Sequence, residues 1–150
     1  MNMLNAFSFM TDTATLAIFD LQAIRHRKSD TADWWSIPDD ELDEMNKGNI
    51  AFIGLGNDGF YTINLCDKIE DPDVKINIHC PSGEIFIGAG EDTTGGNLEP
   101  DDPQYRAGEI IFLPVGYYDV SLKKVNSLLF ISIIYSKVRI NKFENVLRLY

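Results

Sequence analysis

The residue types that most often bind metals or act as nucleophiles are scarce in this sequence. His26 and His79 are its only histidines, and Cys66 and Cys80 are its only cysteines. A zinc site needs three or four His, Cys or carboxylate ligands around one ion. His79 and Cys80 are adjacent, so in a strand their side chains point to opposite faces. His26 lies in the basic run Arg25-His26-Arg27-Lys28, which repels a cation. We therefore predict no metal site and no bound cofactor.

Catalysis by a side-chain nucleophile is also not indicated. It needs a Ser or Cys beside a His base and an orienting acid, and the sequence contains no nucleophile elbow. A pair of carboxylates can catalyse proton transfer, and the 23 acidic residues leave such a pair open, but nothing singles out two of them. We predict that the protein is not an enzyme, and we keep an enzyme of unknown chemistry as the third hypothesis.

One glycine motif has the form of a dinucleotide-binding loop. Residues 54–59 read Gly-Leu-Gly-Asn-Asp-Gly. A dinucleotide site requires a helix after the third glycine, because the pyrophosphate binds at that helix's N-terminus. Here the residues that follow, Phe60–Cys66, alternate as in a strand. These glycines are interpreted as turn residues.

Negative charge is the most distinctive property of the chain. Residues 1–120 contain 22 acids and 7 bases, a net charge of −15, whereas residues 121–150 contain 6 bases and 1 acid, a net charge of +5. The acids gather in two clusters without bases, one at residues 30–44 and one at residues 91–102. A field of this sign repels nucleic acid and anionic membranes and attracts basic proteins. The alternative is an acidic surface that only keeps the protein soluble.

Two adjacent tryptophans lie within the first acidic cluster, just before the segment at about residues 37–46. Trp34-Trp35 can pack as a hydrophobic staple, or one ring can lie exposed as an aromatic anchor within a charged rim, as in interface hot spots. An aromatic platform for a sugar is a weaker alternative. The predicted partner-binding residues are Trp34, Trp35, Asp39, Asp40, Glu41, Asp43, Glu44, Glu91, Asp92, Glu99, Asp101 and Asp102.

Most of the chain has the pattern of short β-strands. Val74–Cys80 alternates apolar with polar residues, as expected for a strand with one wet face. Residues 49–55 and 60–66 flank an Asn-Asp-Gly turn and predict a hairpin. Further strands are predicted at residues 13–20, 84–88, 109–113, 117–125, 128–135 and about 138–143.

One segment, at about residues 37–46, predicts a short acidic helix capped by Ser36 and closed by Gly48. About eight strands and one helix favour an all-β, mainly antiparallel fold, either a β-sandwich or a flattened barrel, in a single domain of residues 1–150.

Two features bear on the compartment. Two cysteines in 150 residues do not form a disulfide framework, so we expect buried free thiols, with a single bridge between Cys66 and Cys80 as the alternative. The N-terminus lacks a secretory signal, and the longest apolar run, Leu128–Tyr135, is too short to span a membrane. We expect a cytoplasmic protein.

The order of elements in residues 50–126 resembles a known family. The hairpin pattern leads to the alternating strand Val74–Cys80, then to Pro-Ser-Gly with a short strand, and last to a strand-turn-strand around Leu113-Pro114-Val115-Gly116-Tyr117-Tyr118. This resembles the competence-associated nuclease inhibitor of Gram-positive bacteria and similar small immunity proteins. The resemblance implies a β-sandwich that binds a protein, and it carries over no individual functional residue.

The sequence thus predicts a bacterial inhibitor or immunity protein that neutralises a cognate toxin, possibly a nuclease, through an acidic surface. The alternative is a ligand-binding or self-assembling module, since the basic C-terminal strands of one copy can meet the acidic half of another.

Overall fold

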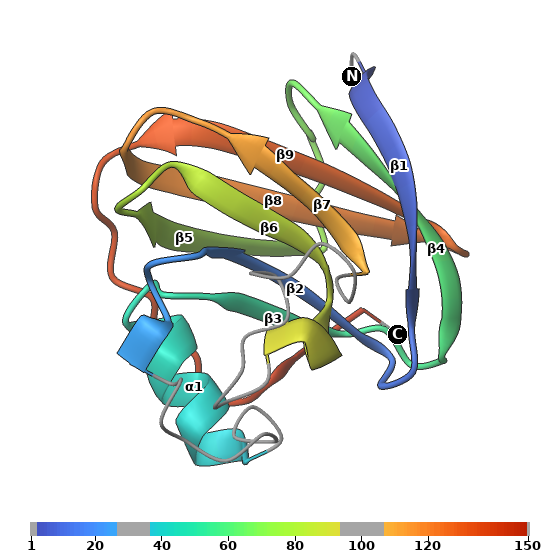
Figure 1. The fold of residues 1–150 in the computed structure, drawn as a ribbon, viewed down its shortest axis with the longest axis horizontal. Helices are drawn as coiled ribbons and strands as arrows, with labels where there is room; N and C mark the ends of the chain where they lie inside the picture. The colour runs from blue at the N-terminus through green and yellow to red at the C-terminus, as the bar shows by residue number, and fades with distance from the viewer. Residues whose placement is uncertain (1–2, 27–36, 94–106, 150) are drawn as a thin grey trace.

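Two five-stranded sheets pack face to face as a sandwich (Figure 1). The computed structural model describes residues 3–26, 37–93 and 107–149. In sheet A the strand order is β1-β4-β9-β8-β5, and in sheet B it is β10-β3-β2-β6-β7. Sheet A consists of β1 (Met3–Thr11), β4 (Gly59–Cys66), β5 (Val74–Cys80), β8 (Gly116–Val125) and β9 (Leu128–Ser136). Sheet B consists of β2 (Thr15–Asp20), β3 (Ala51–Gly54), β6 (Glu84–Ala89), β7 (Gly108–Phe112) and β10 (Leu147–Arg148).

The predicted all-β class is confirmed, and the architecture is the sandwich rather than a closed barrel. Adjacent strands are antiparallel except in two pairs, β4 with β9 and β3 with β10. The described residues contain ten strands, and sequence patterning missed two of them, the two-residue strand β10 and the nine-residue strand β1. Its inward residues Phe7 and Phe9 contact the core, but its outward residues Leu4 and Met10 are apolar too, so the alternation is blurred.

The predicted hairpin of residues 49–66 is wrong. β3 lies in sheet B, between β2 and β10, whereas β4 lies in sheet A, between β1 and β9. The turn between them carries the chain across the sandwich, with positive φ angles at Gly56 and Gly59 and a hydrogen bond from the Leu55 N–H to the Ala14 carbonyl oxygen (2.7 Å). The same turn residues serve a hairpin and a crossing between sheets, so turn chemistry alone does not distinguish them.

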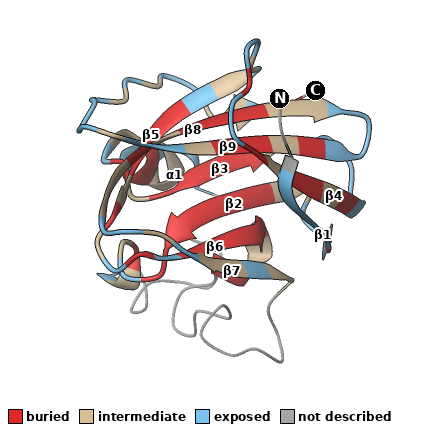
Figure 2. Cartoon of the chain, turned by 90° about the horizontal axis from the view of Figure 1, so that it is seen from above, coloured by how far each residue is buried: buried red, intermediate tan, exposed pale blue. Residues whose placement is uncertain are grey.

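The core lies between the sheets, and the centre of sheet B is covered on both faces (Figure 2). Along β2, every residue from Leu16 to Asp20 is buried, which explains why its sequence does not alternate. Phe19, Phe52 and Phe86 are fully buried, and the rings of Phe19 and Phe86 lie 5.5 Å apart. Such aromatic pairs add roughly 1 kcal/mol beyond the burial of their area.

The predicted acidic helix is present as α1 (Pro38–Asn46), with Pro38 in its first turn. Its N-cap is Ile37, which makes no capping hydrogen bond from its side chain, and Ser36 lies outside the described residues. Gly48, with φ of 75°, ends the helix as predicted. Met45 is the helix's buried anchor. Among the described residues, no helix has the length and apolar character needed to cross a bilayer.

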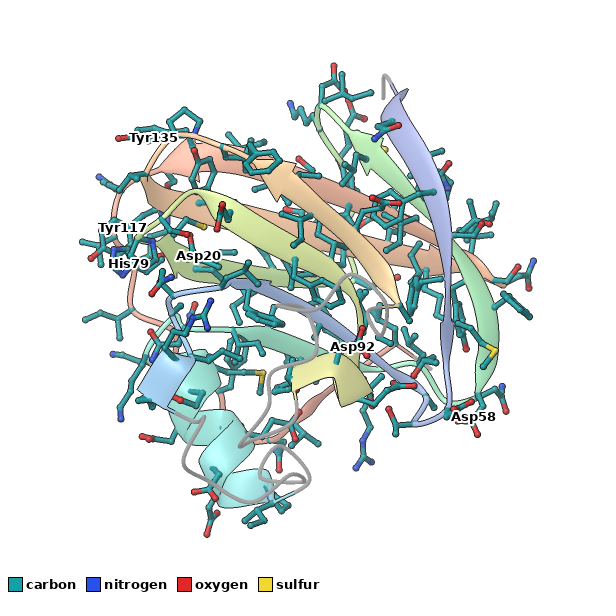
Figure 3. All side chains as sticks on the ribbon, viewed as in Figure 1. Asp20, Asp58, His79, Asp92, Tyr117 and Tyr135 are labelled. Atoms are coloured by element: carbon teal, nitrogen blue, oxygen red, sulfur yellow. The ribbon has the colours of Figure 1, made fainter. Side chains whose placement is uncertain are left out.

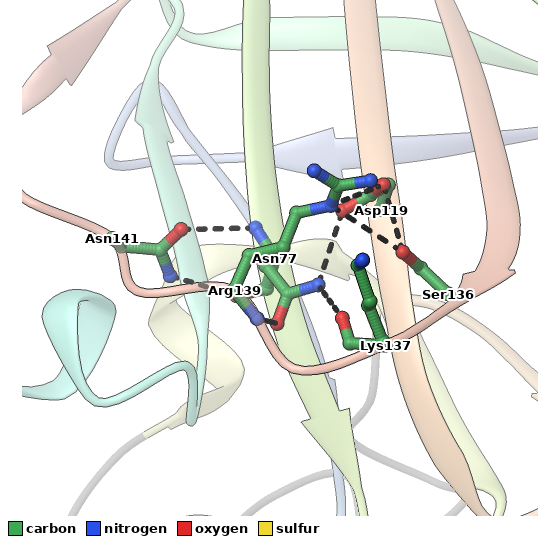
Figure 4. A network of polar contacts seen from close by, with 6 residues as sticks. All are labelled: Asn77, Asp119, Ser136, Lys137, Arg139 and Asn141. Carbon is green, nitrogen blue, oxygen red and sulfur yellow. Dashed lines mark hydrogen bonds and ion pairs between the residues drawn. The ribbon is translucent and has the colours of Figure 1, made fainter.

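The last predicted strand, at residues 138–143, is not a strand. Residues 137–141, which we call the strap, run along the open edge of β5 (Figure 4). The Asn141 side chain replaces a neighbouring strand: its Oδ1 accepts from the Asn77 N–H (3.1 Å), and its Nδ2 donates to the Asn77 carbonyl oxygen (2.7 Å). At this edge of β5, the backbone of Asn77 is thus hydrogen-bonded by an amide side chain, whereas the sequence pattern predicted the backbone of a neighbouring strand.

The two cysteines are free and buried, as predicted. Cys66 lies on β4 and Cys80 on β5, and β9 and β8 separate these strands in sheet A. Burial raises the pKa of the Cys80 thiol to about 12, with the Asp20 charge contributing. Burial also raises the pKa of Cys66. Both thiols are therefore protonated and poorly nucleophilic at neutral pH.

Candidate functional site

The predicted partner-binding residues separate into three groups by position. Asp39, Asp40, Glu41, Asp43 and Glu44 lie on α1. Glu91 and Asp92 lie on the 3-10 helix η3 (Gly90–Thr93). The other five lie outside the described residues and are Trp34, Trp35, Glu99, Asp101 and Asp102.

Glu44 is the member of the helical cluster that faces the interior. Its side chain is fully buried. Its Oε2 forms a hydrogen bond with Nε2 of His26, and its Oε1 accepts a hydrogen bond from the Asn49 side chain (3.0 Å). Buried carboxylates are retained where such partners satisfy them. Glu44 therefore fastens α1 to its neighbours and is not available to a docking protein.

The two η3 acids also serve the fold. Oε1 of Glu91 accepts from the hydroxyls of Thr11 (2.7 Å) and Thr13 (2.9 Å), and its Oε2 accepts from the Asp12 N–H (2.6 Å). Asp92 is buried and accepts from the Ala107 N–H. These contacts tie η3 to the turn between β1 and β2 and to the start of β7. Asp92 is labelled at η3 in Figure 3. In its described part, the second acidic cluster therefore holds neighbouring segments of the fold together.

Asp20 is a further buried carboxylate that sequence reasoning did not single out. It accepts from the Gln22 N–H (2.8 Å), the Ser82 hydroxyl (2.7 Å), the Ser82 N–H (2.9 Å) and the Gly83 N–H (2.8 Å). It thereby joins the end of β2 to the turn between β5 and β6. A lone Asp at a strand end gives no sequence signal for this role, because its partners Ser82 and Gly83 lie 62 and 63 residues further along the chain.

Four acids of α1 remain at or near the surface: Asp39, Asp40, Glu41 and Asp43. Asp43 forms an exposed i,i+4 ion pair with Lys47 (2.9 Å). Asp39 lies on the rim of a groove of about 690 Å³ between α1 and the C-terminal segment. Pro38, Leu42 and Val146 give the groove its apolar lining, while Asp39, Glu144 and Arg148 supply its charges. We call this the α1 groove.

Glu41 is the carboxyl group of this region whose pKa is strongly shifted. Burial raises its pKa to about 7, and the nearby Arg148 charge opposes that rise. The carboxyl is therefore about half protonated near neutral pH, where an unperturbed Glu is fully ionised. The negative charge of the α1 surface depends on pH in the physiological range.

The groove joins residues more than 100 positions apart, which explains why sequence reasoning found only its helical side. Glu144 and Arg148 belong to the C-terminal segment, for which the sequence indicates only an excess of bases.

Sequence reasoning also overlooked a third group of acids: residues 67–73 contain Asp67, Glu70, Asp71 and Asp73. In the structure this segment links β4 to β5, and its Asp71 carbonyl accepts from Lys123 (3.0 Å).

No metal centre is found in the part of the chain that the structure describes: no three His, Cys, Asp or Glu side chains are grouped to hold an ion. The charged groups that the geometry does bring together are the carboxylates of Asp39 and Glu144 and the guanidinium of Arg148, which border the apolar lining of the α1 groove. This arrangement is suited to binding a cationic, long-stemmed side chain such as Lys or Arg.

The sequence matches the model of a family of unknown function, DUF6386, over residues 3–149. The chain belongs to DUF6386. No curated protein matches this DUF6386 chain.

Two solved structures are similar to this DUF6386 member. One is ComJ from Bacillus subtilis, described as an inhibitor of the DNA-degrading activity of NucA: it has a TM-score of 0.52 and 12% sequence identity, and the match covers 90% of this chain and 98% of ComJ. The other, described as crocagin biosynthetic gene J, has a TM-score of 0.48 and 12% identity, with 89% of this chain and 100% of that chain covered. The likeness to ComJ is one of fold. It extends the resemblance expected from residues 50–126 to most of the chain.

Proposed function

We propose that this DUF6386 protein is a non-catalytic inhibitor that neutralises a basic protein partner, a nuclease toxin, by binding it through the surface of α1. The observation that carries the proposal is the α1 groove, in which accessible carboxylates border an apolar lining. The ComJ-like fold supports the inhibitor role, because ComJ is itself described as a nuclease inhibitor.

The groove suits the side chains that a nuclease uses to hold nucleic acid. The methylene stem of a Lys or Arg lies along Leu42 and Val146, while its charged head reaches Asp39 or Glu144. The carboxylates of α1 then stand where phosphates would lie on the partner. Trp34 and Trp35, which precede the helix in sequence, are proposed to supply the apolar anchor.

Charge at this surface contributes mainly to the speed and specificity of association. The chain carries a net charge of −10, and complementary fields steer a basic partner toward the acidic face. Glu44, Glu91 and Asp92 contribute to this field, but their hydrogen bonds within the fold remove them from direct contact.

The test compares two variants that lose the same number of charges. The site variant carries D39N, D40N, E41Q and D43N on α1. The control variant carries D58N, E70Q, D71N and E109Q, which change four exposed acids outside α1. Each protein is used as bait in lysate from the source organism, the captured partner is identified and purified, and its degradation of plasmid DNA is measured with each bait.

We expect the wild type and the control variant to capture a basic nuclease and to stop DNA degradation, and the site variant to lose both activities. If both variants lose binding equally, only overall charge matters and the α1 surface is not the interface. If the purified partner degrades DNA undiminished in the presence of the wild type, the inhibitor function is wrong.

A further inference from the structure

The strap exposes its apolar side chains and turns its polar ones toward the fold. Val138 is 62% exposed and Ile140 is 80% exposed. Between them, Arg139 pairs with Asp119 of β8 (3.1 Å), and after them Asn141 binds the backbone of β5. A surface segment normally has the opposite arrangement, because apolar side chains gain by leaving water. The outer side of the strap is therefore suited to contact with another apolar surface.

Bases accompany these exposed apolar side chains. Lys137 begins the strap, and Lys75 lines the same pocket beside β5 as Ile140. Both lysines are exposed, and neither forms an ion pair with the described residues. Residues 120–143 contain five bases and no acid. In a chain of net charge −10, the strap is thus a basic and apolar strip.

The α1 groove offers the complementary chemistry. Its apolar lining is bordered by the carboxylates of Asp39 and Glu144, with Arg148 as the base among the lining residues. Asp43, one helical turn after Asp39, is also exposed and lies on the same face of the helix. An exposed apolar side chain flanked by lysines, as on the strap, fits a groove of this kind.

The strap and α1 lie on the same side of the fold, where the strap descends to the C-terminal end of the helix (Figure 1). Asn141 donates to the Met45 carbonyl oxygen (2.9 Å), and the Phe143 N–H donates to Oδ1 of Asn46 (2.7 Å). These contacts, together with those to β5, hold the strap outside the groove of its own chain. A second copy is not restricted in this way.

The two elements also match in length. The helix has nine residues, a length of about 13 Å, and the five-residue strap spans at most about 17 Å. Because the acidic and the basic element are neighbours, a twofold axis between them sets each element opposite its complement on a second copy. Such a self-complementary surface is what an isologous dimer requires.

We propose that two copies of this chain form a twofold dimer in which the strap of each lies in the α1 groove of the other. Ile140 packs against the apolar lining of the second copy's groove, and Lys137 lies against Asp39 of the partner subunit. Symmetry makes each contact twice. The net charge of −10 on each copy opposes association at long range, and the opposite charges at this face offset that repulsion locally.

The dimer covers the surface that is also proposed to bind a basic protein, so a second copy and that protein exclude each other from α1. The inference does not depend on the inhibitor function, because all of its tests use the purified chain alone. Failure to capture or inhibit a nuclease would leave the dimer unaffected, and a monomeric chain would leave the inhibitor function unaffected.

Charge reversal on each side of the contact provides the first test. K75E with K137E makes the strap acidic, and D39K with D43K makes the helix basic. Sedimentation equilibrium is measured on the wild type, on each variant and on an equal mixture of the two variants. We expect the wild type to form a species of twice 16.9 kDa and each variant alone to be monomeric. The mixture should form a heterodimer, because opposite charges then face each other at both contacts.

The same reversals separate local charge from overall charge. Replacing two acids by two bases changes the net charge from −10 to −6, and replacing two bases by two acids changes it from −10 to −14. If overall charge alone governed association, D39K with D43K would dimerise more readily than the wild type. That result overturns the proposal, as does a wild type that is monomeric at every concentration or a mixture that stays monomeric.

A matched pair of apolar substitutions then locates the contact. I140S removes the exposed apolar side chain of the strap, and F112S removes one of similar exposure on β7, where Phe112 is 75% exposed. We expect I140S to raise the dimer dissociation constant by about tenfold or more, and F112S to leave it unchanged. Equal effects of the two variants overturn the assignment to the strap.

Cross-linking keeps the proposal testable if a charge-reversed variant folds poorly, which its thermal unfolding reveals. In a mixture of D39C and I140C, a short bismaleimide should link one protein to the other. In a mixture of D39C and F112C it should not. The buried Cys66 and Cys80 serve as an internal background in both mixtures. The absence of the link between D39C and I140C also overturns the proposal.

Discussion

Asp43 and Glu44 are adjacent on α1, yet only one of them is in contact with water. Asp43 pairs with Lys47 at the surface, whereas Glu44 is fully buried against His26 and Asn49. An exposed ion pair contributes little to stability because solvent screens it. A buried carboxylate whose partners are removed leaves polar groups unsatisfied. Neighbouring acids of one cluster therefore have different physical roles.

Substitution of the two residues should separate these roles. We expect E44Q to lower the free energy of unfolding by about 2 kcal/mol, because the Gln amide cannot accept hydrogen bonds through both of its terminal atoms as the Glu44 carboxylate does from His26 and Asn49. We expect D43N to change it by less than about 0.5 kcal/mol. Urea unfolding followed by circular dichroism measures both. A neutral E44Q would mean that the buried contact contributes nothing to stability.

Glu41 makes stability and binding depend on pH in opposite directions. Its pKa is raised to about 7 in the folded chain from 4.5, so between these values the folded state binds more protons than the unfolded state. Stability from this group is therefore present at pH 4.5 and below, and it decreases as pH rises through 7. Binding of a basic partner should instead strengthen over the upper part of that range, as the carboxylate ionises.

E41Q removes both effects. Compared with the wild type, its melting temperature should be higher at pH 8 and similar at pH 5. The affinity for the captured partner should rise between pH 6 and pH 8 in the wild type and stay flat in E41Q. Thermal scans and surface plasmon resonance measure the two quantities. A wild-type affinity that is constant over this range would place Glu41 outside the interface.

At the scale of elements, the strap shows how the chain closes one sheet edge. Besides the two contacts with the Asn77 backbone, Asn141 donates to the Met45 carbonyl oxygen (2.9 Å), so one amide links β5 to the end of α1. Arg139 donates to Asp119 (3.1 Å), and the Asn77 side chain donates to the same carboxylate (3.0 Å). The strap is fixed by side chains rather than by a backbone ladder.

Removing that amide should loosen the edge. We expect N141A to lower the free energy of unfolding by about 2 kcal/mol, because it leaves the Asn77 N–H and two carbonyl oxygens without their partner. Hydrogen exchange at the Asn77 amide should accelerate. K142A, at an exposed neighbouring position, is the control and should change neither quantity. Unchanged exchange in N141A would show that water replaces the side chain without loss.

At the scale of the whole molecule, net charge governs encounter with other proteins. The acidic excess lies in residues 1–120 and the basic excess in residues 121–150. The fold places the C-terminal bases Lys123 and Arg139 beside the carboxylates or carbonyls of other segments. The field that reaches solvent is nevertheless set by the total of −10.

The association rate with a basic partner should therefore fall as salt is added. Between 0.05 and 0.5 M NaCl we expect a decrease of roughly tenfold or more in the association rate constant, with a smaller change in the dissociation rate constant. Stopped-flow fluorescence with the captured partner measures both. A rate constant that does not change with salt would contradict electrostatic steering.

The sequence alone determined the class of fold, the helix at residues 38–46 and most of the strands, because each depends on local periodicity and turn chemistry. It also determined the charge imbalance, which is a property of composition. The tertiary structure decided which sheet each strand joins, because the turn after β3 serves equally for a hairpin or a crossing.

Only the tertiary structure could decide which acids are available to a partner. Glu44 and Asp43 have the same chemistry and adjacent positions, and burial distinguishes them only once α1 packs against residues far away in the sequence. The α1 groove exists for the same reason, because it is defined by what the rest of the chain covers or leaves uncovered. Local pattern carries no information on such long-range contacts.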